Sequence, residues 1–114
     1  MSKKYHVRER SFLNLRTDMR AYIIGVVEDT REIPNSDQDE WRRGTIQLEL
    51  ADCHDDVSYE FGLGTPEDRE NSLFKIRKMA EVINAVRSAI ETEAASIESR
   101  ESFKPVEKVH ATSA

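Results

Sequence analysis

The stretch Gly64-Thr65-Pro66-Glu67-Asp68 decides the fold of this chain, because it begins a helix. Thr65 is a favourable N-cap, since its hydroxyl can accept a hydrogen bond from a free backbone N–H of the first turn. Pro66 then stands at the first helical position, where its missing N–H costs nothing and its fixed φ suits a helix. Glu67 and Asp68 place negative charge at the positive end of the helix dipole. These signals together predict a helix that begins at Pro66.

The predicted helix is longer than the strands that could support it. Its apolar residues recur at steps of three and four, which is the spacing of one helix face; they are Leu73, Ile76, Met79, Ala80, Ile83, Val86 and Ile90. No glycine or proline follows Pro66 until Pro105, and we expect the helix to end near Arg100. Such a helix is roughly 50 Å long, whereas a strand of about eight residues is roughly 27 Å long. A sheet of that size covers only the first half of the helix.

The two halves of the predicted helix carry opposite charge. Residues 74–88 contain four basic side chains and one acidic one, a net charge of +3, and residues 90–101 contain four acidic and one basic, a net charge of −3. Acidic residues near a helix C-terminus oppose the helix dipole, so local stability does not explain them. Two copies that cross antiparallel near Ser88 and Ala89 would set each basic half against an acidic half.

We therefore predict a homodimer with twofold symmetry through this helix. Its expected interface consists of Ile83, Val86, Ala89, Ile90, Ala94 and Ile97. The alternative is a helix whose second half is solvated and frays at its end.

The clearest strands are residues 45–52 and 57–63, in which apolar and polar side chains alternate. A period of two is typical of a half-buried antiparallel pair, and residues 53–56 can form the short turn between them. Residues 20–28 are apolar on both faces, which predicts a central strand. Gly25 in its middle suggests a bulge or a close backbone approach.

A further strand, continuous or broken, is predicted within residues 1–20, where Tyr5 and Val7 alternate with polar neighbours. The sequence thus predicts an α+β fold: a three- or four-stranded antiparallel sheet followed by one long C-terminal helix packed on one face. We expect a single domain over residues 1–101 and a disordered tail over 102–114.

Composition limits the classes of function. A chain of 114 residues with 38% apolar and 34% charged residues is one very polar domain with a small core. Its net charge of −5 argues against general nucleic-acid binding. The single cysteine, Cys53, excludes an internal disulfide and suits a reducing compartment. No signal peptide or membrane span is recognisable, so we expect a cytoplasmic protein with no membrane partner.

One cluster in the sequence could ligate a metal or exchange protons: Asp52-Cys53-His54-Asp55-Asp56. Adjacent residues in a tight turn point in different directions, however, and the CxxC and HxxxH spacings of zinc sites are missing. Asp and His are also ordinary turn residues. A small metal- or thiol-dependent enzyme centred on Cys53 and His54 is therefore kept only as an alternative function.

Other catalytic and ligand-binding motifs are incomplete. Asn35, Asp37 and Asp39 match the first three ligands of a calcium loop, but Glu40 and Ile46 stand where the loop requires glycine and a bidentate glutamate. The sequence has no glycine-rich phosphate loop and no nucleophile elbow. It therefore predicts no catalytic residue, no bound metal and no cofactor, and whether the chain is an enzyme stays open with the balance against it.

The leading hypothesis is a small non-catalytic interaction protein, an adaptor or regulatory subunit, that acts as a helix-mediated homodimer with an unknown protein partner. Trp41, Arg42 and Arg43, in the long loop that follows Asp29, are the expected partner-binding residues, although a lone tryptophan often caps a core instead. The rival hypothesis is nucleic-acid binding through a basic N-terminal arm. Its phosphate-binding residues would be Lys3, Lys4, Arg8 and Arg10.

Overall fold

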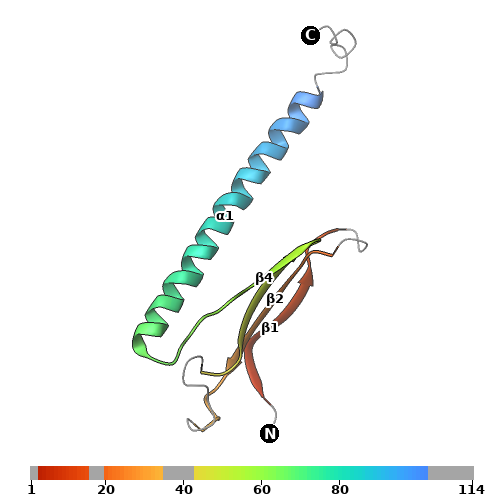
Figure 1. Cartoon of the computed structure of the whole chain (residues 1–114). Coiled ribbons are helices and arrows are strands. Elements are labelled where there is room, and N and C mark those ends of the chain that lie inside the picture. Colours follow the sequence, from red (N-terminus) through yellow and green to blue (C-terminus); the bar gives the residue numbers. More distant parts are fainter. Residues whose placement is uncertain (1–2, 16–19, 35–42, 103–114) are drawn as a thin grey trace. The chain divides into compact units, whose positions relative to one another are not determined.

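A four-stranded antiparallel sheet followed by one long helix makes up the described part of the chain (Figure 1). The computed structural model describes residues 3–15, 20–34 and 43–102. The elements are β1 (Lys4–Phe12), β2 (Tyr22–Asp29), β3 (Ile46–Asp52), β4 (Asp55–Tyr59) and α1 (Pro66–Ser102). Each strand pairs with the next, in the order β1-β2-β3-β4. The predicted α+β fold is confirmed, with four strands.

The chain divides into two compact units, Met1–Lys75 and Ile76–Ala114. The first unit contains the sheet and the first turns of α1, and the second contains the rest of the helix. The two units are described separately below.

The strand predicted within residues 1–20 is β1, and the predicted central strand is β2, which pairs with β1 on one side and β3 on the other. Neither alternative suggested for Gly25 is right: the pairing of β2 with β3 continues without a shift from Tyr22 to Val27, and a Cβ at Gly25 would meet the Val7 side chain at an ordinary 3.9 Å. The irregularity lies in β1 instead, between Tyr5 and Val7.

The last strand differs from the prediction at both ends. Asp52 pairs with Asp55, so the turn contains only Cys53 and His54, and β4 begins two residues earlier than residue 57. Its pairing with β3 stops at Tyr59, so the predicted strand over 57–63 ends four residues too late.

The connection between β4 and α1, residues 60–65, explains why the strand ends. Three of its carbonyl oxygens accept hydrogen bonds from side chains of α1 rather than from β3. The bonds are Lys75 Nζ to Glu60 O at 2.7 Å, Ser72 Oγ to Gly62 O at 2.6 Å and Arg69 Nη1 to Leu63 O at 2.9 Å. The Lys75 ammonium also lies 5.0 Å from the ring centroid of Phe61, which is buried. The first turns of the helix are thus fastened to this connection.

The start of α1 follows the prediction. The Thr65 hydroxyl accepts a hydrogen bond from the backbone N–H of Asp68 at 3.0 Å, and Pro66 is the first helical residue. The helix then continues through 37 residues, about 55 Å at 1.5 Å per residue. The longest strand has 9 residues, or about 30 Å. Ser102 is the last helical residue, and the rest of the predicted tail lies outside the described residues.

No helix in the described ranges combines the length and the apolar composition that a membrane span requires.

Replacing Thr65 with alanine tests the helix start. The substitution removes the acceptor of the Asp68 N–H, and losing such a cap costs about 0.5–2 kcal/mol. We expect Thr65→Ala to lower the free energy of unfolding by about 1 kcal/mol, measured by urea denaturation at a fixed protein concentration. Thr65→Ser keeps the hydroxyl and serves as the control. Equal stability of the alanine and serine variants would contradict the assignment.

Candidate functional site

One face of the sheet is mostly apolar. The strand register places three rows of paired residues on it, because paired residues in neighbouring strands project to the same side. We call this surface the apolar face. Its apolar members are Val7, Ile23, Val27, Ile46, Leu48, Leu50, Val57 and Tyr59, and the same rows include Glu9 and Ser11 of β1 and Gly25 of β2.

The apolar face is open. Val7 and Val57 are 43% and 44% exposed, and the other six apolar members are only half-buried. Among the described residues, Ala21 and Phe61 are the buried apolar ones, and no large side chain is fully buried. Because burial of apolar surface is the dominant favourable contribution to folding, a covered apolar face would add greatly to stability.

The opposite face of the sheet is held by polar contacts. The Tyr22 hydroxyl donates a hydrogen bond to Glu49 Oε2 at 2.7 Å, and the guanidinium of Arg10 lies 5.8 Å from the centroid of the Tyr22 ring. The hydrogen bond to Glu49, together with burial, raises the pKa of Tyr22. This face also carries Phe12, which is 67% exposed, and the half-buried Ile24 and Val26.

The second exposed apolar surface lies on α1. At 100° per residue, seven residues fall within an arc of about 80°. We call them the helix stripe: Ile76, Met79, Ile83, Val86, Ile90, Ala94 and Ile97. The exposed fractions of Ile83, Val86 and Ile90 are 55%, 51% and 61%.

Five of the six residues predicted for the dimer interface belong to the helix stripe. The exception is Ala89, which lies about 60° beyond Val86 at 100° per residue. It flanks the stripe next to Val82, which is also exposed. Whether any of these residues forms an interface stays a prediction.

Ion pairs within α1 neutralise only part of its charge. Three pairs occur among its described residues: Lys78 with Glu81 at 3.1 Å, Arg87 with Glu91 at 3.2 Å and Arg100 with Glu93 at 3.1 Å. All six side chains are exposed, and exposed pairs contribute little to stability. The opposite net charges of the two helix halves remain.

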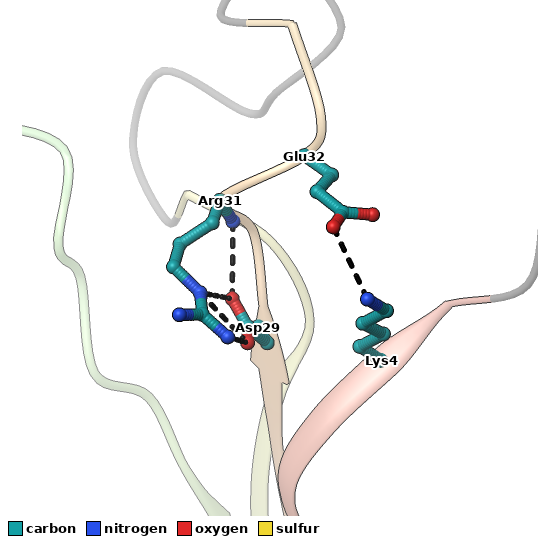
Figure 2. A network of polar contacts seen from close by, with 4 residues as sticks. All are labelled: Lys4, Asp29, Arg31 and Glu32. Carbon is teal, nitrogen blue, oxygen red and sulfur yellow. Dashed lines mark hydrogen bonds and ion pairs between the residues drawn. The ribbon is translucent and has the colours of Figure 1, made fainter.

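A polar network fastens the end of β2 and the start of the following loop (Figure 2). The buried Asp29 carboxylate accepts hydrogen bonds from the backbone N–H of Arg31 at 3.1 Å and from its guanidinium at 2.7 to 3.1 Å. Nearby, Lys4 of β1 pairs with Glu32 at 3.1 Å. The bonds from Arg31 lower the pKa of Asp29 from 3.8 to about 2.

This network was not predicted from the sequence. The available signal was an aspartate at the end of a strand, two residues before an arginine. The side chain of aspartate often accepts a hydrogen bond from the backbone N–H two residues ahead.

The other end of the loop that follows Asp29 is bonded to Glu28. Glu28 is buried, and its Oε1 accepts a hydrogen bond from the backbone N–H of Thr45 at 2.8 Å. Gly44 has a φ of 89°, and a Cβ there would collide with the Thr30 side chain, so only glycine fits. Of the predicted partner-binding residues, Arg43 is described, with a φ of 61°, while Trp41 and Arg42 lie outside the described residues.

Among the described residues, the fold brings no third metal ligand to the alternative site at Cys53 and His54. Cys53 is exposed in the two-residue turn beside His54. No group of three or more His, Cys, Asp or Glu side chains that could hold a metal ion occurs among the described residues. An open depression of about 530 Å³ lies at this end of the sheet, but neither Cys53 nor His54 lines it. The candidate calcium ligands Asn35, Asp37 and Asp39 lie outside the described residues.

Several side chains of the basic arm are engaged within the chain. Lys4 pairs with Glu32, as described above. The Arg8 guanidinium lies 5.1 Å from the ring centroid of Tyr5, and that of Arg10 lies over Tyr22. The arm is therefore an edge strand in which Lys4, Arg8 and Arg10 each contact another side chain of the chain.

The Asp29–Arg31 contact predicts a specific pH dependence. A carboxyl group with a folded-state pKa of about 2 and an ordinary value of 3.8 stabilises the fold above pH ~4. That contribution is lost as the pH falls through about 4 towards about 2. We expect Asp29→Asn to be less stable than the natural protein near neutral pH, with the difference closing below pH ~4, measured by urea unfolding. Arg31→Ala should remove the same pH-dependent contribution to the free energy of unfolding. A difference in unfolding free energy between variant and natural protein that is constant with pH would contradict this account.

Neither the models of known protein families nor the curated proteins match the sequence, and no solved structure matches the fold.

Proposed function

We propose that this chain is a small non-catalytic interaction protein, an adaptor or regulatory subunit, that acts as a homodimer through α1. The observation that carries the proposal is the helix stripe: α1 runs unbroken to Ser102, and its apolar residues are exposed as far as Ile97. Exposed apolar surface of this extent, bordered by charges, marks an association surface.

The helix offers enough length for a stable pair. The segment from Ile76 to Ser102 spans about 40 Å at 1.5 Å per residue. In a twofold dimer each large side chain of the helix stripe is buried twice, and complete burial of one such side chain contributes about 1.5–3 kcal/mol. That contribution opposes an association cost of about 4–15 kcal/mol.

The charge pattern favours an antiparallel pair. If the two helices cross at Ser88, Met79 of one copy lies opposite Ile97 of the other, and Val86 lies opposite Ile90. The half with a net charge of +3 then faces the half with a net charge of −3. In a parallel pair like charges would face each other along the whole contact, which is destabilising.

The Asp29–Arg43 loop is the proposed contact for a protein partner, since the network at Asp29 and the turn at Gly44 hold both of its ends. A cytoplasmic location suits the exposed thiol of Cys53.

Nucleic-acid binding is the weaker alternative, because Lys4, Arg8 and Arg10 already have partners.

Replacing Ile90 with glutamate tests the dimer. The substitution puts two charges into the centre of the proposed interface and removes two buried side chains. We expect Ile90→Glu to raise the dimer dissociation constant roughly hundredfold or more, since each ~1.4 kcal/mol corresponds to a factor of ten. Sedimentation velocity measures this as a shift towards the 13.1 kDa monomer.

Thr92→Glu is the matched control for Ile90→Glu. It adds the same charge two residues further along the helix, about 160° away from the helix stripe at 100° per residue. We expect this variant to remain dimeric. Natural protein that sediments only as a monomer at micromolar concentration would contradict the proposed dimer.

Salt dependence tests the antiparallel direction. Raising the ionic strength from about 0.01 M to about 0.1 M shortens the screening length from roughly 30 Å to roughly 10 Å. We expect this change to raise the dissociation constant of the dimer about threefold or more, because attraction between opposite halves is screened. A dissociation constant that falls as salt is added would indicate a parallel pair.

A further inference from the structure

We draw no further inference here: the strongest candidate, the open depression of about 530 Å³ where the apolar face meets the β3–β4 turn, is lined by Asp52, Asp55 and Asp56 together with apolar side chains, but an acidic cluster alone identifies no ligand and nothing in the structure shows what covers this face.

Discussion

The backbone carbonyls of the β4–α1 connection are the constraint on which the rest of the structure depends. Glu60, Gly62 and Leu63 direct these acceptors to side chains of α1 and not to β3. These bonds tie the connection to the first turns of α1, and the pairing with β3 stops at Tyr59.

The sheet that results has two faces of very different character. On one face, Tyr22, Glu49 and Arg10 satisfy each other through a hydrogen bond and a cation–π contact. On the other, the side chains are apolar and incompletely covered. With Ala21 and Phe61 as the buried apolar residues of the described chain, the stability of the fold depends on what covers this face.

In the proposed dimer, charge determines whether the two helices are parallel or antiparallel. Apolar contact is not directional, and the helix stripe alone would permit parallel and antiparallel pairs. The basic first half and acidic second half of the helix favour one of the two. Ion pairs such as Arg87–Glu91 lie along the sides of the helix and leave the net charge of each half in place.

The sequence by itself determined those features that depend on neighbouring residues. Thr65 and Pro66 predicted the start of α1, because capping involves groups within one turn. The alternation of apolar and polar side chains likewise predicted β3 and β4, and apolar residues on both faces predicted β2. The recurrence of apolar residues at steps of three and four predicted the helix stripe, with Ala89 placed on its flank by the helical angle.

Only the tertiary structure decided what depends on distant partners. The end of β4 was predicted four residues too late, because Ser72 and Lys75 lie 10 and 15 residues from the carbonyls they bind. The apolar face became recognisable as one continuous surface only when the register aligned Val7, Val27 and Ile46 across three strands. A period of two shows that a strand has an apolar side, but it cannot show which sides of separate strands coincide or how wide a surface they form.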